Sequence, residues 1–229
     1  LSITHCGQTK AYYFDLTANM RSIWHAVPKA HMKTASLDAI EAARNETGNQ
    51  AVRATLAHMD FVHPDDIPRF AALNVTAQTS IQWAARDPSY FNIGSFVGMD
   101  KVENAYPVKS IMQSGANQSF GADWPASAYL STYKPLELIE AAVTRRLRGE
   151  LAMPVRNADQ AVSVGEAIIA MTRNTAIQVG ELDTLGSISV GKLADVVLLE
   201  SNLFDIPADN IHSTTITMTV VNGDIVHGQ

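Results

Sequence analysis

Three residues that can bind a metal ion each follow a short apolar segment: His25, His58 and Asp123. A single histidine in such a position is more often a hydrogen-bonded structural group than a ligand, so a structural interpretation stays open. Neutral imidazoles bind Zn²⁺ well, and the ion lowers the pKa of its bound water toward neutrality. A carboxylate beside that water can accept the proton and deliver it to a leaving group. A bound metal also accounts for a carboxylate at the end of an apolar strand, because it compensates the charge.

The other histidines show no comparable pattern. His63 lies close to Asp65 at the beginning of a predicted helix, and both are interpreted as residues that start this helix. The remaining histidines share no geometry and are predicted to lie on the surface: His5, His31, His212 and His227.

Strand and helix patterns alternate between residue 21 and about residue 149. Alternating hydrophobicity and short apolar runs predict four strands, at residues 21–25, 52–58, 75–82 and 116–123. Each strand is followed by a segment that reads as helical, at residues 34–47, 64–73, 106–114 and 135–147. Four strand–helix units in succession predict a parallel sheet with crossover helices.

Two α/β architectures accept this order, an open doubly wound sheet and part of a (β/α)₈ barrel. An open nucleotide-binding sheet usually has a glycine-rich turn after its first strand, whereas here His-Ala-Val-Pro follows Trp24. In a barrel the carboxyl ends of the strands converge on one face, where active sites form. Because His25, His58 and Asp123 each lie at a predicted strand end, they favour the barrel. Four strands cannot close a barrel of eight, so we expect an open, curved sheet.

The end of the chain has a different pattern. Ser163 and Glu166 form a capping box that opens a helix. Residues 186–226 are rich in strand patterns and predict antiparallel strands outside the barrel, with Asn222-Gly223 in a tight hairpin turn. The sequence thus predicts two parts, a partial barrel over residues 1–180 and a small β element over residues 181–229.

Composition excludes several classes of protein. The 229 residues carry a net charge of −6, and no basic cluster resembles a nucleic-acid footprint. The densest basic run, residues 145–148, is interpreted as a solvated helix end. No apolar run approaches the 18 or so residues of a membrane span, and the single Cys6 excludes an internal disulfide framework. The chain begins without Met or a signal-peptide pattern, so its natural start is expected to lie further upstream.

Several segments resemble the C-terminal half of an amidohydrolase: LAHMDFVHPDDIPRFAALNV, FGADWPAS, LELIEAAVTRR, SVGEAIIAMTRNTA and LGSISVGKLADVVLLESNLFDIP. The sequence is most similar to amidohydrolase family 3, near N-substituted formamide deformylases and D-aminoacylases. The resemblance runs from about residue 25 to the end of the chain. The motif at residues 186–197, taken together with Asp-Trp-Pro at residues 123–125, is fairly specific.

The resemblance implies the last four units of a metal-dependent (β/α)₈ barrel and part of a small β-sandwich. It implies that His25 and His58 are metal ligands and that Asp123 both binds the metal and shuttles the proton. It further implies a divalent metal, most simply Zn²⁺, and hydrolysis of a carbon–nitrogen bond other than a peptide bond in a small-molecule substrate. Residues that can contact this substrate are Gln78, Trp83 and Trp124, although core packing is an alternative role for Trp83.

Two features of the family have no counterpart here: the His-x-His pair of the first strand and the bridging residue of the fourth. We therefore expect an N-terminal half of the same polypeptide to complete the barrel, and the 229 residues alone to be inactive. The alternative from another class is a non-catalytic truncated or degenerate homologue with a structural or partner-binding role. A deaminase or isomerase of the same superfamily would keep the ligands and change the substrate loops.

Overall fold

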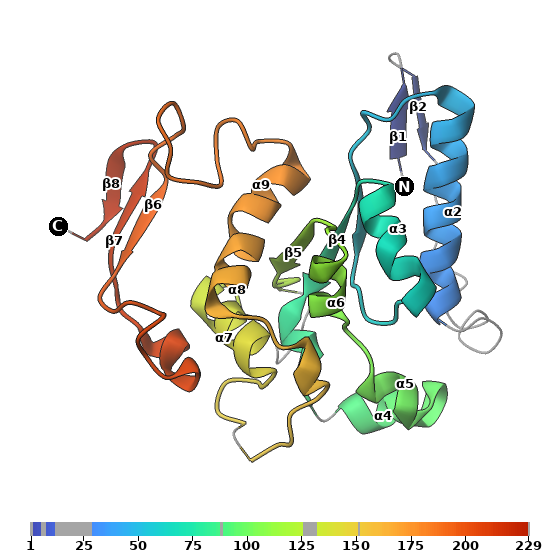
Figure 1. Cartoon of the computed structure of the whole chain (residues 1–229). Helices are drawn as coiled ribbons and strands as arrows, with labels where there is room; N and C mark the ends of the chain where they lie inside the picture. Colours follow the sequence, from blue (N-terminus) through green and yellow to red (C-terminus); the bar gives the residue numbers. More distant parts are fainter. Residues whose placement is uncertain are drawn as a thin grey trace.

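The computed structural model describes residues 2–5, 8–11, 29–87, 89–125, 132–150 and 152–228 (Figure 1). The first two segments are short strands, β1 (Ser2–His5) and β2 (Gln8–Ala11), which pair antiparallel. The strand predicted at residues 21–25, and with it His25, lies outside the described residues.

The other three predicted strands are confirmed, although each is shorter than expected. They are β3 (Ala54–Ala57), β4 (Val75–Ser80) and β5 (Gln118–Gly121). They form one parallel sheet in the order β3-β4-β5, with Ala57 opposite Gln78 and Ser80 opposite Gly121. Because consecutive strands are neighbours and parallel, their carboxyl ends lie along one edge of the sheet.

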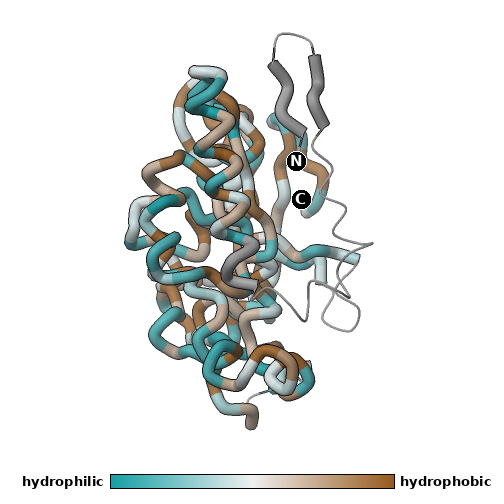
Figure 2. Tube along the Cα trace, turned by 90° about the vertical axis from the view of Figure 1, so that its right-hand side faces the viewer, coloured by the Kyte–Doolittle hydropathy of each residue, from teal (hydrophilic) through white to brown (hydrophobic). Residues whose placement is uncertain are grey.

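Helices connect the strands, as the alternating pattern predicts. α2 (Lys29–Thr47) precedes β3, while η1 (Pro64–Asp66) and α3 (Ile67–Ala72) join β3 to β4. α6 (Val108–Gln113) leads into β5, and α7 (Pro135–Thr144) follows it. Figure 1 shows α2 and α3 on one side of the sheet's strands and α7 beyond β5. Along the helices, hydrophobic and hydrophilic residues alternate in the way that one-sided burial requires (Figure 2).

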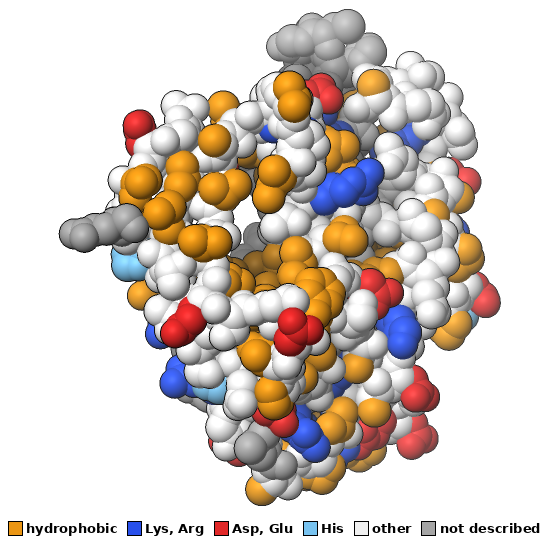
Figure 3. All heavy atoms as spheres, turned by 60° about the vertical axis from the view of Figure 1, so that its left-hand side comes forward, with side chains coloured by type: hydrophobic (Ala, Val, Ile, Leu, Met, Phe, Trp, Pro, Cys, Tyr) orange, Lys and Arg blue, Asp and Glu red, His pale blue; other side chains and the backbone are white. Residues whose placement is uncertain are grey.

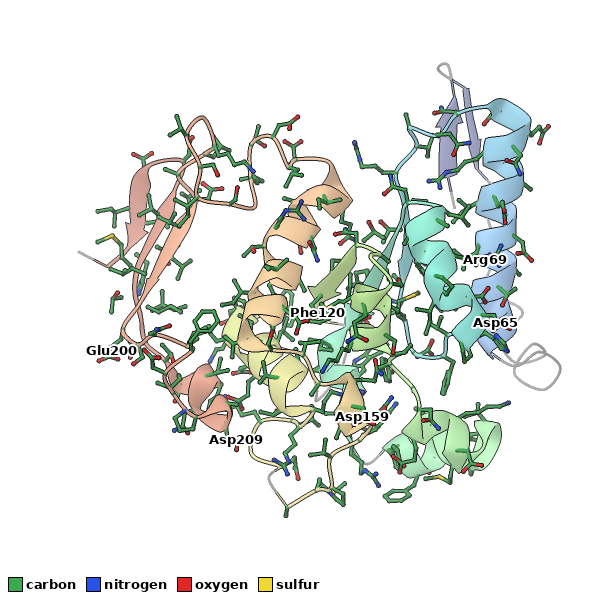
Figure 4. The ribbon with its side chains drawn as sticks, in the orientation of Figure 1. Asp65, Arg69, Phe120, Asp159, Glu200 and Asp209 are labelled. Carbon is green, nitrogen blue, oxygen red and sulfur yellow. The ribbon has the colours of Figure 1, made fainter. Side chains whose placement is uncertain are left out.

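The two faces of the parallel sheet differ in polarity. One face packs against α2, α3 and α6 and contributes Leu56, Val75 and Ala77 to an apolar cluster. Phe120 of the same face joins a second cluster with residues of α7, and its position on β5 is labelled in Figure 4. Successive side chains alternate across a strand, so the pairing register assigns to the opposite, polar face Thr55, Ala57, Thr76, Gln78, Ser80, Ser119 and Gly121.

Arg69 joins α3 to α2 on the outer surface (Figure 4). Its guanidinium donates to Asp66 at 2.9 Å and, on α2, to Asp38 at 2.6 Å and Glu41 at 2.9 Å. These hydrogen bonds, led by the one to Asp66, raise the pKa of Arg69 above its ordinary value. The cluster is a structural connection between the helices that cover β3 and β4.

The segment between β4 and α6 is more helical than its sequence pattern suggests. It contains η2 (Ile81–Ala84), α4 (Ser89–Val97) and α5 (Met99–Glu103). Gly98 separates α4 from α5 with a φ of 93°, a conformation that favours glycine. Tyr90, Ile93 and Val97 of α4 have the i, i+3, i+7 spacing of a helix, a signal that the sequence interpretation of this stretch as loosely structured does not use.

The interpretation of the basic run at residues 145–148 as a solvated helix end is wrong for its first member. α7 ends at Thr144, and Arg145 follows in a left-handed conformation with its side chain 0% exposed. The guanidinium donates to the carbonyl of Arg156 at 3.2 Å and to those of Tyr106 and Ala105 at 3.5 Å. Burial, and then the charge of Arg156, lower the pKa of Arg145 to about 9, so the group stays charged at neutral pH.

The predicted capping box is confirmed at the start of α8 (Val164–Met171), which follows η4 (Ala158–Gln160) and precedes α9 (Arg173–Val179). The backbone N–H and hydroxyl of Ser163 both donate to Glu166 at 2.7 Å, and the Ser163 oxygen accepts from the Glu166 N–H at 3.2 Å. The backbone hydrogen bond, followed by that of the hydroxyl, lowers the pKa of Glu166.

Replacing Glu166 by alanine is expected to reduce the free energy of unfolding by about 1 kcal/mol at pH 7. Since the folded-state pKa lies below the unfolded value, this contribution is complete above the ordinary glutamate pKa and is lost as the pH falls through the folded-state pKa. Urea unfolding at several pH values measures the difference between the two proteins, which should shrink on acidification. The exposed Glu150 provides the matched control, and an equal loss in Glu150→Ala would contradict the explanation.

The antiparallel element predicted near the end of the chain is confirmed. β6 (Val196–Leu199), β7 (Ile216–Val221) and β8 (Asp224–His227) form a sheet of their own in that order. Asn222 and Gly223 both have positive φ, as a tight hairpin turn requires. Residues 186–195, which also fall in the predicted strand region, form no strand and consist of bends, a turn and irregular backbone. Hydrophobic side chains are visible on this part of the surface in Figure 3, and they include Val197, Leu198 and Ile225.

His212, predicted to lie on the surface, is instead partly buried, and its side chain is only 24% exposed. His212 belongs to η5 (Ala208–Ser213), which packs on α7. Its Nδ1 lies 2.6 Å from a carboxylate oxygen of Glu140, and its backbone N–H donates to the same oxygen at 2.9 Å. Glu140 is buried, so this pair connects the segment before β7 to α7.

None of the described helices is both long and apolar enough to cross a membrane.

Candidate functional site

His58 is the first residue after β3, at the carboxyl edge of the parallel sheet. Its side chain is partly buried, and its backbone is left-handed, with a φ of 56°. The imidazole stacks on Trp83 with ring centroids 5.1 Å apart and planes inclined by 13°. Its Nδ1 lies 3.4 Å from the hydroxyl of Ser80, the last residue of β4. The ring is therefore positioned at the end of the neighbouring strand.

The loop after His58 is tied to the segment before α6. The Asp60 N–H donates to the carbonyl of His58 at 2.8 Å, and the Tyr106 N–H donates to the carbonyl of Asp60 at 2.7 Å. Tyr106 is buried, and this burial, followed by the negative charge of Asp60, raises the pKa of its hydroxyl. The phenol is thus neutral at physiological pH, and it serves here as a structural group.

Asp123 lies two residues beyond β5, at the same edge of the sheet. Its side chain is partly buried and its φ is 52°, so it shares the left-handed conformation of His58. The Gln82 side-chain amide donates to the carbonyl of Ala122, which fixes the backbone just before Asp123. The next peptide bond, Trp124–Pro125, is cis.

His58 and Asp123 approach the site from opposite sides of β4. Because β3 and β5 flank β4, their axes lie about 10 Å apart, twice the usual strand spacing. Ser80 and Gln82, which contact His58 and the residue before Asp123, come from the end of β4 and from η2. The centre of the site is therefore the end of β4, with an imidazole on one side and a carboxylate on the other.

The donor types present at this edge fit a divalent metal. Imidazole nitrogen and carboxylate oxygen are both ligands of Zn²⁺, and the Ser80 contact at Nδ1 of His58 leaves Nε2 as the nitrogen available to a ligand. Within the described ranges no three His, Cys, Asp or Glu side chains form a metal-binding group. The third predicted ligand, His25, falls outside those ranges, so the predicted ligand set stays a prediction.

The residues predicted to contact substrate lie near this edge but differ in environment. Gln78 is on the polar face of β4, with its side-chain nitrogen against Gly121, where a Cβ would lie only 2.4 Å from it. Trp83 is partly buried, packs against the apolar cluster around Phe120 and stacks on His58. Trp124 is exposed and meets the ring of Tyr133 edge to face, with centroids 6.0 Å apart. Their role in substrate binding stays a prediction.

Sequence reasoning missed Ser80 and Gln82. Both are buried polar residues, and they flank Ile81 at the end of β4. Buried polar groups need hydrogen-bond partners, but the burial itself is visible only in the fold. Their partners, His58 and Ala122, come from other strands and cannot be read from local sequence.

The sequence of this chain is similar to those of known proteins. A family model described as Amidohydrolase family matches residues 19–227. N-substituted formamide deformylase of Arthrobacter pascens is 28% identical over 192 residues, which are 82% of this chain and 33% of that protein. Protein LONG AFTER FAR-RED 3 of Arabidopsis thaliana is 26% identical over 193 residues, again 82% of this chain and 31% of the relative. The chain therefore spans about a third of the length of these curated relatives.

Solved structures show the same fold. A metal-dependent hydrolase from Pyrococcus horikoshii has a TM-score of 0.64 at 21% identity, over 78% of this chain and 34% of that one. An adenosine deaminase from Xanthomonas campestris with bound zinc has a TM-score of 0.55 at 16% identity, over 90% of this chain and 44% of that one. The family model covers nearly the whole chain, so the resemblance carried by the sequence motifs is confirmed: the chain belongs to the amidohydrolase family.

Proposed function

We propose that this chain is part of a metal-dependent hydrolase that cleaves a carbon–nitrogen bond other than a peptide bond, with an amide as the first class of substrate to test. The observation that carries the proposal is the position of His58 and Asp123 beyond β3 and β5, at one edge of a parallel sheet. Family membership supports it, as does the resemblance to a relative named for the deformylation of N-substituted formamides.

In this proposal His25, His58 and Asp123 hold a divalent metal, with Zn²⁺ as the first choice. The ion, when bound, supplies a water that ionises near neutral pH. Asp123 accepts the proton of the attacking water on a carboxylate oxygen and transfers it to the departing nitrogen. Gln78, Trp83 and Trp124 surround a small-molecule substrate. Residues encoded upstream of Leu1 complete the barrel, because the parallel sheet described here has three strands.

The competing proposal is a non-catalytic homologue with a structural or partner-binding role. The hydrolase proposal requires the protein to bind a metal, and the non-catalytic proposal does not. Isothermal titration of Zn²⁺ into the chain joined to its upstream residues is expected to give one saturable site. His58→Ala should weaken binding by at least about 10-fold, since it removes a ligand.

His63→Ala is the matched control, because His63 caps η1 through its Nδ1 and lies at the other end of the same loop. Equal affinity in the parent protein, His58→Ala and His63→Ala would contradict the ligand assignment. Absence of any saturable binding by the parent protein would favour the non-catalytic alternative.

A further inference from the structure

We propose that Trp83 is a positioning residue for His58, a role that its stacked indole performs in addition to any contact with substrate. The inference rests on the proposed function in so far as it treats His58 as a metal ligand. The sequence leaves two roles open for Trp83, core packing and substrate binding. The contacts among Trp83, His58, Ser80 and Arg156 support the positioning role.

The stacking geometry restricts the orientation of the imidazole. The two ring planes are within 13° of parallel, and their centroids are 5.1 Å apart. In this arrangement the indole covers one face of the imidazole, so the imidazole cannot tilt toward it about the Cβ–Cγ bond without a clash. His58 follows a four-residue strand and has a left-handed backbone, so its own chain segment offers little other support for the ring.

The contact with Ser80 concerns the tautomer of His58, that is, which of the two ring nitrogens carries the proton. The Ser80 hydroxyl lies 3.4 Å from Nδ1 of His58 and is 0% exposed, so water does not compete for it. When an acceptor takes the hydrogen bond of one protonated histidine nitrogen, the other nitrogen keeps its lone pair for a metal, and the Ser80 hydroxyl can be this acceptor for Nδ1–H. In that tautomer Trp83 holds the plane of the ring and the contact with Ser80 leaves Nε2 as the ligand nitrogen.

The position of Trp83 is in turn set by a buried arginine from a distant part of the chain. Arg156 donates to the carbonyl of Trp83 at 3.5 Å, to that of Ala85 at 3.4 Å and to that of Val102 at 2.9 Å. Its guanidinium also lies over the ring of Tyr106 at 4.8 Å. Arg156 lies in the segment between α7 and α8 and thus connects η2 to the segment before α6. Through Arg156, this segment supports η2, which carries the indole.

The experiment compares Trp83→Leu with Trp83→Phe, because phenylalanine keeps a flat ring for stacking and leucine does not. Two quantities are measured: the ring ¹⁵N chemical shifts of His58 at pH 8 without metal, which report its tautomer, and the affinity for Zn²⁺ by isothermal titration. Trp83→Leu is expected to mix the His58 tautomers and to weaken Zn²⁺ binding by about 10-fold. Trp83→Phe should restore both to within about 3-fold of the parent protein.

Phe91→Leu is the matched control, since Phe91 is an exposed aromatic residue on α4, in the same segment between β4 and α6, and its ring meets that of Tyr90. Unchanged His58 shifts and unchanged Zn²⁺ affinity in a folded Trp83→Leu protein would overturn the inference. If Trp83→Leu does not fold, Trp83→Phe and Trp83→His still test it, because a failure of both flat rings to preserve the shifts would also overturn it. Failure of the parent protein to bind Zn²⁺ would instead contradict the proposed function, and the tautomer measurement would remain decisive for Trp83.

Discussion

Asp123→Asn is expected to lower the rate of amide hydrolysis by about a thousand-fold in the chain joined to its upstream residues. Asparagine has nearly the same shape as aspartate but cannot accept a proton at physiological pH, so the attacking water keeps its proton and the departing nitrogen does not receive one. Release of aniline from formanilide measures the rate, with other N-substituted formamides and acetamides assayed in parallel.

Asp159→Asn is the control for this substitution, because Asp159 is an exposed residue of η4 (Figure 4) and lies on neither of the segments that carry His58 and Asp123. It should leave the rate unchanged. A rate in Asp123→Asn within about 3-fold of the parent protein would exclude Asp123 as the proton carrier. A loss of rate together with a large loss of Zn²⁺ affinity would instead assign to Asp123 a role mainly as ligand.

Arg145→Met is expected to reduce the free energy of unfolding by about 3 kcal/mol. The guanidinium is completely buried and donates to three backbone carbonyls, those of Arg156, Tyr106 and Ala105. Methionine fills part of the volume but cannot donate to these carbonyls. Those of Ala105 and Tyr106 keep the Asn157 side chain and the Val108 N–H as donors, whereas that of Arg156 loses the guanidinium, and a buried carbonyl that loses a partner is destabilising. Urea unfolding followed by circular dichroism measures the change.

Arg148→Met is the matched control from the same basic run. Arg148 is more than half exposed and pairs with Glu137 at 2.9 Å, and an exposed pair of this kind contributes less than about 1 kcal/mol. Similar losses in the two variants would contradict the structural role of Arg145. A loss confined to Arg145→Met would show that one basic run contains both a surface group and a core group.

Local signals predicted much of the fold. The period-two pattern before His58, the capping box at Ser163 and the Asn222-Gly223 turn all depend on residues close in sequence, and each is confirmed. The errors concern groups whose environment depends on distant segments. Arg145 is buried because carbonyls about 40 residues away accept its hydrogen bonds, and His212 is paired because α7 presents Glu140 some 72 residues earlier.

The candidate site also contains some residues that local sequence indicates and others whose role depends on distant segments. Positions at strand ends identified His58 and Asp123, because parallel strands bring their carboxyl ends to one edge whatever the details of packing. The supporting residues could not be found in this manner. Ser80, Trp83 and Arg156 matter through contacts with residues on other elements, and single-sequence periodicity carries no information about such pairs.

The left-handed backbones of His58 and Asp123 have a consequence for how this protein can evolve. Each residue occupies a region that glycine enters freely and that other residues enter at a cost of about 1 kcal/mol. Selection for stability alone would therefore favour glycine at both positions, although histidine, aspartate and asparagine all occur in this region more often than most residues. A lineage that no longer needs the chemistry should drift to glycine at these positions first and become more stable as it does. Under the proposed function, the identity of positions 58 and 123 in a related chain is thus a record of whether the proposed chemistry is still under selection.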